Sequence, residues 1–150
     1  MRDYDDASGL SPQQAGLYAW RGALEEEQGD VTAALEDYGE ALQRDANLDG
    51  ILNRRGRLRL QANMLDEAIA DFSEAIRANP RDASSYALRA VAFVRKGNFD
   101  AASASFDAAL QVEHDVAWIY SERGQLYEKE KHFPQALADY SEAIRLEPES

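Results

Sequence analysis

The apolar positions of this chain follow the spacing of α-helices. Near the end of the chain, Tyr120, Gly124 and Tyr127 recur at i, i+4 and i+7, which predicts an amphipathic helix over residues 117–130. Pro134 is predicted to open a second helix, because the first turn of a helix tolerates a missing backbone N–H. The second helix carries one apolar stripe, made of Ala136, Leu137, Tyr140, Ala143 and Ile144. This part of the chain is therefore predicted to be a pair of antiparallel helices.

The same pattern recurs every 34 residues. The segment ADYSEAIRLEP at residues 138–148 has counterparts in ASFDAALQVEH, ADFSEAIRANP and EDYGEALQRDA, each 34 residues before the last. The chain divides without a gap into four units, residues 15–48, 49–82, 83–116 and 117–150. A period of this length is typical of solenoids, in which each unit packs on its neighbours. We therefore expect an all-α solenoid of four helix pairs.

Some columns of the repeat hold only small residues. They are Gly22, Gly56, Ala90 and Gly124 in the first helix, and Ala34, Ala68, Ala102 and Ala136 in the second. Small side chains let two helix backbones approach closely. One large ring per unit is predicted to fill the space beside them, and these rings are Tyr38, Phe72, Phe106 and Tyr140.

With these residues the chain resembles the tetratricopeptide repeat (TPR) family. The family's A-x₃-F pattern stands here as Ala34-x₃-Tyr38, Ala68-x₃-Phe72, Ala102-x₃-Phe106 and Ala136-x₃-Tyr140. The resemblance covers residues 15–150, with Ala46 and His114 in place of the closing proline and Ala90 in place of a glycine. It implies a right-handed superhelix of four TPR helix-turn-helix repeats, whose first helices line a concave binding face.

The two ends of the chain raise separate questions. Residues 1–14 are predicted to be a partial or degenerate repeat or a linker, because Asp3-Tyr4 aligns with Asp139-Tyr140; the alternative is an acidic leader that matches by chance. The last unit has no polar capping helix after it, which is predicted to leave Leu137, Ile144 and Leu146 only partly covered. We expect either a segment of a longer repeat array or a homo-oligomer formed end to end.

Composition narrows the classes of partner and location. The 150 residues carry a formal net charge of −12, which argues against nucleic acid and anionic membranes as partners. The absence of cysteine excludes disulfides, thiolate catalysis and cysteine zinc sites. The sequence contains no run of 18 apolar residues and no apolar leader, and we therefore expect a cytoplasmic location.

The residue types that support catalysis or metal binding are scattered. His114 and His132 are isolated in predicted turns, and no nucleophile–base pair or glycine-rich phosphate loop is visible. We therefore expect no enzyme activity, no cofactor and no metal site.

An arginine precedes the small residue of the first helix in every unit: Arg21, Arg55, Arg89 and Arg123. An aspartate precedes the ring in three of the four units: Asp37, Asp71 and Asp139. An anion site is one interpretation, but repetition favours a structural Arg–Asp link, either between the two helices or to the next repeat. Arg89 should be the exception, because its unit carries Ser105 instead.

The stripe of the first helices that faces away from the packed columns is the candidate binding surface. Its candidate ligand-binding residues are Asn53, Arg57, Leu60, Ala87, Val91, Val94, Arg95, Trp118, Ser121 and Gln125. An exposed apolar patch with a polar rim indicates a binding site. We expect a short peptide that places an apolar side chain over Val91 and an acidic group near Arg57 and Arg95. The alternative is that helix crowding covers these residues.

The function predicted on these grounds is a non-catalytic protein–protein interaction scaffold whose concave groove binds a peptide or a segment of a partner. Two alternatives remain open: a structural spacer or oligomerisation arm of a larger repeat protein, and a docking or regulatory arm of a larger enzyme.

Overall fold

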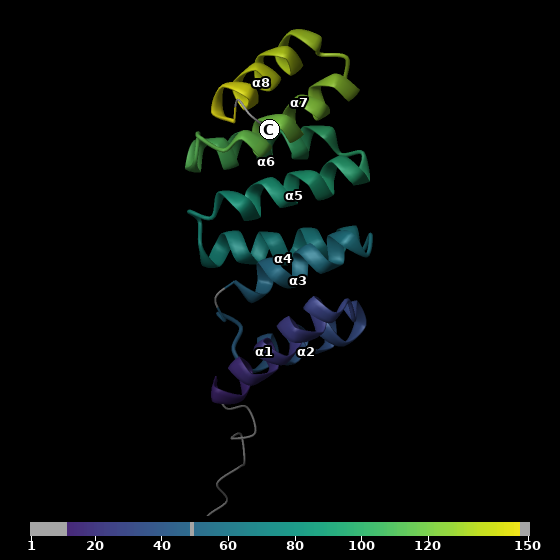
Figure 1. Ribbon diagram of the computed structural model, residues 1–150, viewed down its shortest axis with the longest axis vertical. Helices are drawn as coiled ribbons and strands as arrows, with labels where there is room; N and C mark the ends of the chain where they lie inside the picture. Colours follow the sequence, from purple (N-terminus) through teal and green to yellow (C-terminus); the bar gives the residue numbers. More distant parts are fainter. Residues whose placement is uncertain (1–11, 49, 148–150) are drawn as a thin grey trace, which may run out of the picture.

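The computed structural model describes residues 12–48 and 50–147, and within them the chain forms helices and no strand. The helices are α1 (Pro12–Gln28), α2 (Val31–Arg44), α3 (Ile51–Gln61), α4 (Leu65–Ala78), α5 (Ala83–Lys96), α6 (Phe99–Val112), α7 (Ala117–Lys129) and α8 (Phe133–Leu146). Figure 1 shows them as successive pairs stacked along the long axis, with α1 and α2 at one end and α8 at the other. The predicted all-α solenoid of stacked helix pairs is confirmed (Figure 1). None of the described helices is both long and apolar enough to cross a membrane.

The turn inside each helix pair has the same backbone geometry. The residue two positions before the second helix lies at positive φ in all four pairs, as Gly29 (79°), Asn63 (59°), Gly97 (77°) and Lys131 (62°). Glycine and asparagine adopt this left-handed region readily, whereas lysine does so at a cost. Two of the second helices then begin at side-chain caps, Asp30 and Asn98, each of which accepts from the backbone N–H three residues later. This shared turn keeps the two helices of each pair antiparallel.

Each pair packs through its small residues and its ring, as predicted. A Cβ placed on Gly22 would lie 3.0 Å from the ring of Tyr38, and one on Gly124 would lie 2.9 Å from the ring of Tyr140. Tyr38, Phe72 and Phe106 are fully buried. Tyr140 keeps partial exposure, because no described helix follows α8 to cover its outer side as α3 covers α2.

The second helix of each pair also packs against the first helix of the next. Ile51 and Leu58 of α3 join the core around Tyr38 of α2, and Ile119 and Leu126 of α7 join the core around Phe106 of α6. Every repeat is therefore held both within itself and by its neighbour.

The predicted Arg–Asp link forms in three of the four pairs. Arg55 donates from Nε and Nη2 to Asp71 at 3.0 and 2.7 Å, and Arg123 donates likewise to Asp139 at 2.8 and 2.7 Å. Arg21 makes the same two-pronged contact with Asp37. These three aspartates are buried, so the link replaces their hydration.

Arg89 is the exception that the sequence predicted. Its Nη1 donates to Ser73 Oγ at 3.3 Å, in the preceding repeat, and its buried Nε has no partner among the described residues. Burial lowers the pKa of Arg89. The third repeat therefore holds a cation without the carboxylate that its counterparts have.

The structure tests the predicted helix limits but not the predicted repeat boundaries. The helix predicted over residues 117–130 ends one residue earlier, at Lys129, and the second helix begins at Phe133 with Pro134 in its first turn. Helix α1 begins at Pro12, inside the segment 1–14 that was predicted as a partial repeat or linker. Residues 1–11, which carry the match to a preceding repeat, lie outside the described residues. The boundaries of the four units remain predictions.

Candidate binding groove

An open groove of about 570 Å³ crosses the first helices of the last three repeats. Its lining comes from α3, the loop before α5, α5 itself and α7: Gly50, Asn53, Arg57, Asp82, Ser84, Leu88 and Trp118. Three of the predicted binding residues, Asn53, Arg57 and Trp118, therefore lie around one hollow. We refer to this hollow as the groove.

Arg57 is the unpaired cation of the groove. Its side chain is exposed and makes no hydrogen bond or ion pair with any described residue. Two of the other three arginines of α3, Arg55 and Arg59, donate to Asp71, and the third, Arg54, donates to the Tyr38 hydroxyl. Arg57 thus differs from its neighbours because it points away from the packed face, and its guanidinium is free to bind an anion.

The carboxylate in the groove is already engaged. Asp82 accepts from the backbone N–H of Ser84 at 3.1 Å and from Ser85 Oγ at 2.5 Å. Asn53 Nδ2 donates to Ser85 Oγ at 2.8 Å and reaches Asp82 at 3.4 Å. Asp82 therefore caps α5 and joins it to α3, and its charge is spread over several donors.

Trp118 supplies the apolar wall of the groove. Its side chain is 39% exposed, whereas its neighbour Ile119 is buried in the core between α6 and α7. Leu88 of α5 lies across the same hollow and is partly buried against the core around Phe72. Trp118 and Arg57 thus line the same groove, and tryptophan and arginine are residue types often found at binding hot spots.

Two of the predicted binding residues do not reach the surface. Leu60 is 6% exposed and packs with Ala92 of α5, and Ala87 is completely buried in the core of the third repeat. Both were predicted to belong to an exposed surface; at these two positions the alternative, that neighbouring helices cover them, holds instead. Leu60 packs against Phe72 of α4 and Ala92 of α5, and Ala87 lies in the core that α5 forms with α6 and α7. Leu60 and Ala87 can only support the floor of the groove.

The remaining predicted residues lie around this floor. Val91 and Val94 of α5 are half-buried against the same cores. Arg95 donates from Nη1 to the Leu60 carbonyl at 2.8 Å, so it ties α5 to α3. Arg95 is therefore less available to a ligand than Arg57.

On α7, Ser121 lies in a second hollow of about 320 Å³ together with Trp118 and Ile144. Gln125, one turn further along α7, is exposed. Trp118 thus separates two adjoining hollows, one toward α3 and α5 and the other toward α8.

The groove also contains residues outside the predicted set. Leu88 and Asp82 line it, although neither was included among the candidate ligand residues. Asp82 had a recognisable signal, because an aspartate just before a predicted helix is a typical N-cap. Leu88 had a weaker one: its counterparts in the neighbouring units are Arg54 and Glu122, so an apolar residue there is unusual.

A polar link joins the first two repeats beside a smaller hollow between α1 and α3. The Tyr38 hydroxyl donates to Glu26 Oε2 at 2.6 Å, and Arg54 Nη1 donates to the same hydroxyl at 3.3 Å. Burial and the bond to Glu26 raise the pKa of Tyr38 to about 12, so the phenol stays protonated at neutral pH. The link is structural in character.

Over residues 12–48 and 50–147, no three histidine, aspartate or glutamate side chains are grouped so that they could hold a metal ion.

Comparison with known protein families gives two adjoining matches. Two family models, each described as tetratricopeptide repeat, match residues 53–117 and 117–150. No curated protein matches the chain significantly.

Several solved structures share the fold. A MamA crystal structure is 20% identical, with 89% of this chain and 73% of that chain covered and a TM-score of 0.83. MamA from Desulfovibrio magneticus RS-1 is 17% identical, with 93% and 77% covered and a TM-score of 0.84. The thermophilic TPR protein TTC0263 of Thermus thermophilus is 25% identical, with 93% and 77% covered and a TM-score of 0.78. At these identities the MamA structures are similar to this chain in fold alone.

Proposed function

Because the chain belongs to the tetratricopeptide repeat family, we propose that it is a non-catalytic protein-interaction scaffold whose groove binds a peptide or a segment of a partner protein. Stacked helix repeats form extended concave surfaces that commonly serve for binding. The observation that carries the proposal is that the unpaired guanidinium of Arg57 and the exposed indole of Trp118 line one open groove.

The chemistry of the groove suggests what the partner segment carries. A carboxylate would pair with Arg57, which has the planar geometry for two parallel hydrogen bonds. An apolar or aromatic side chain would lie against Trp118 and Leu88. The chain as a whole carries a net charge of −12, so flanking basic residues on the partner would be attracted to the surrounding surface.

The test is a peptide array probed with the wild-type chain, followed by titration of the bound peptides against variants. Arg57→Glu and Trp118→Ala should each weaken binding by at least about tenfold, because arginine and tryptophan commonly dominate such contacts. Arg77→Glu is the matched control: Arg77 is exposed on α4, pairs with Glu74 of its own helix and carries the same charge change away from the groove. Circular dichroism should show equal helix content in all variants.

Two results would count against the groove. If peptides bind with equal affinity to wild type, Arg57→Glu and Trp118→Ala, the partner contacts another surface. If no peptide on the array binds wild type above background, the alternative of a structural spacer or oligomerisation arm is favoured.

A further inference from the structure

The first helix of the stack exposes residues whose counterparts are buried. Leu17 and Leu24 of α1 are 65% and 57% exposed. One repeat later, Ile51 and Leu58 occupy the same positions on α3 and are 8% and 3% exposed, because α2 covers them. The same positions on α7, Ile119 and Leu126, are covered by α6. Within the described residues, α1 therefore presents an apolar face with no helix over it.

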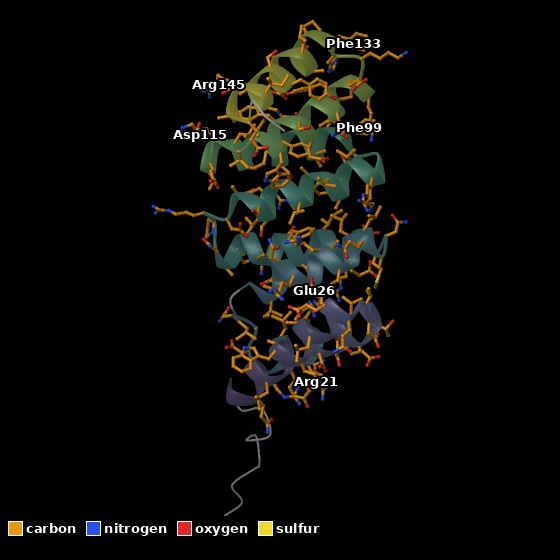
Figure 2. The ribbon with its side chains drawn as sticks, viewed as in Figure 1. Arg21, Glu26, Phe99, Asp115, Phe133 and Arg145 are labelled. Carbon is orange, nitrogen blue, oxygen red and sulfur yellow. The ribbon has the colours of Figure 1, made fainter. Side chains whose placement is uncertain are left out.

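The last helix exposes the complementary half of this contact. Leu137 and Ile144 of α8 are 68% and 65% exposed. Their counterparts on α2, Leu35 and Leu42, pack against the core that α2 forms with α3. Phe133, at the start of α8, is also exposed, and Figure 2 shows it at the opposite end of the stack from Arg21 of α1. One end of the chain thus carries the first-helix half of a repeat–repeat contact, and the other end carries the second-helix half.

From this complementarity we propose that a second copy of the chain docks end to end, with its α1 on α8 of the first copy. The docked α1 would take the position on α8 that α3 takes on α2. The internal contact occurs three times within the chain, so its geometry and residue types are already those of a stable interface. Burial of the four exposed leucine and isoleucine side chains supplies the driving force.

A polar contact repeated between the repeats supports the same register. Arg123 of α7 donates to Asp107 of α6 at 2.7 Å, and Arg89 of α5 donates to Ser73 of α4 at 3.3 Å. Arg21 is the counterpart of both arginines on α1, and its side chain is 62% exposed, against 17% for Arg123. In the docked pair Arg21 would face Ser141, which is the counterpart of Ser73 and Asp107 on α8.

The exposed Trp20 fits this arrangement as well. It is 77% exposed, and its counterpart Arg54 contacts the Tyr38 hydroxyl of the preceding repeat. In the docked pair Trp20 would lie at the hydroxyl edge of Tyr140, which is only partly buried within one chain. Arg57 of the groove lies on α3, away from both docking faces.

A contact between two different ends does not close on itself. Each docked pair keeps one free α1 face and one free α8 face, so association continues as a series of lengthening stacks unless the rotation closes a ring. This behaviour separates the proposal from a two-fold dimer, which stops at two chains.

The test uses two variants that each block one end. Leu24→Glu places a charge on the α1 face, and Leu137→Glu places one on the α8 face; both positions are exposed within one chain, so folding should be preserved. In analytical ultracentrifugation, wild type should show mass rising with concentration beyond a dimer. Docking of either variant would bury an unpaired carboxylate, so self-association should weaken by at least about tenfold. At concentrations where wild type associates, each variant alone should therefore stay monomeric. An equimolar mixture of the two should form a dimer and nothing larger.

The matched control is Val112→Glu, an apolar-to-acidic change at a partly exposed position of α6, away from both ends. It should associate as wild type does, as should Arg57→Glu in the groove. A wild-type chain that remains monomeric at its solubility limit overturns the proposal. So does a dimer of either blocked variant alone, because that result requires a contact between like ends.

The facing position of Arg21 gives a second, gain-of-function test. Ser141→Asp copies Asp107 and should tighten association by about two- to fivefold, as an exposed ion pair does, and less at high salt. Ser141→Arg should weaken it, because two arginines would then face each other. If both changes leave association as it is, α1 does not dock on α8 in this register.

Discussion

Gly56 lies against the ring of Phe72 so closely that a Cβ on Gly56 would come within 2.8 Å of Phe72 Cε1. Phe72 is completely buried, so its ring has no room to retreat. The contact between Gly56 and Phe72 therefore sets the short distance between α3 and α4 in the second repeat.

Gly56→Ala should destabilise the chain even though alanine favours helices. The steric overlap with Phe72 costs about 1–3 kcal/mol, against a gain of about 1 kcal/mol in helix propensity. Urea unfolding monitored by circular dichroism should show a lower midpoint. Gly16→Ala is the control, because nothing lies within 4 Å of a Cβ there, and it should stabilise by about 0.5–1 kcal/mol.

Ser105→Asp should stabilise the third repeat. It places a carboxylate 16 residues after Arg89, as Asp71 stands 16 residues after Arg55, and gives the unpartnered Nε of Arg89 an acceptor. Hydrogen bonds to charged groups contribute about 1.5–3 kcal/mol. Thermal unfolding at neutral pH should show the gain, and Ser105→Asn, which lacks the charge, should show less of it. A lower melting temperature for the aspartate variant would refute this account of Arg89.

Lys131→Gly should stabilise the turn between α7 and α8. Lys131 lies at φ 62°, where side chains are disfavoured. Its counterparts Gly29 and Gly97 have no side chain and adopt positive φ without this cost. Relief of the strain is worth about 1 kcal/mol. The reverse exchange, Gly97→Lys, should lose a similar amount in the same denaturation assay. Equal stability of all three chains would mean that the turn relaxes without cost.

Asp37 should give the chain a stability that is lost in acid. The bond from Arg21 lowers the pKa of Asp37 below its ordinary value of 3.8. Its contribution is therefore fully present above pH 3.8 and disappears as the pH falls through the lower pKa of the folded state. Nearby, burial raises the pKa of Glu25, so protonation of Glu25 offsets a part of the loss.

The measurement is the urea midpoint as a function of pH between about 7 and 2.5. Asp37→Asn should start lower at neutral pH and fall less steeply below pH 3.8, because the asparagine does not titrate. A parallel pH dependence of wild type and variant would exclude Asp37 as a source of the acid sensitivity.

The contacts that recur in every unit were predictable because the 34-residue period samples each of them four times. The column of Gly22, Gly56 and Gly124 faces a ring in each of its units, so the pairing of helices followed from spacing alone. The exception at Arg89 was also predictable, because a missing partner is visible as a break in a column.

The binding surface was harder to predict, because it depends on how successive first helices cross. Leu60 and Ala87 carry no mark in the sequence that separates them from exposed apolar residues. Leu60 is buried against α4 and α5, and Ala87 is buried against α6 and α7. Arg57 and Arg95 likewise look equivalent along the chain. The carbonyl of Leu60, which engages Arg95 and not Arg57, distinguishes them in three dimensions.

The bonds of Asn53 to Ser85 and of Arg95 to Leu60 fix α3 and α5 relative to each other without any partner present. Because these bonds already hold the groove in place, it needs little rearrangement when a peptide binds, and less conformational freedom is lost on binding. In stopped-flow experiments the observed rate of peptide association should then rise in proportion to peptide concentration without a plateau, at about 10⁵–10⁷ M⁻¹s⁻¹. Cutting both bonds, with Asn53→Ala and Arg95→Ala together, should introduce a slow step that saturates.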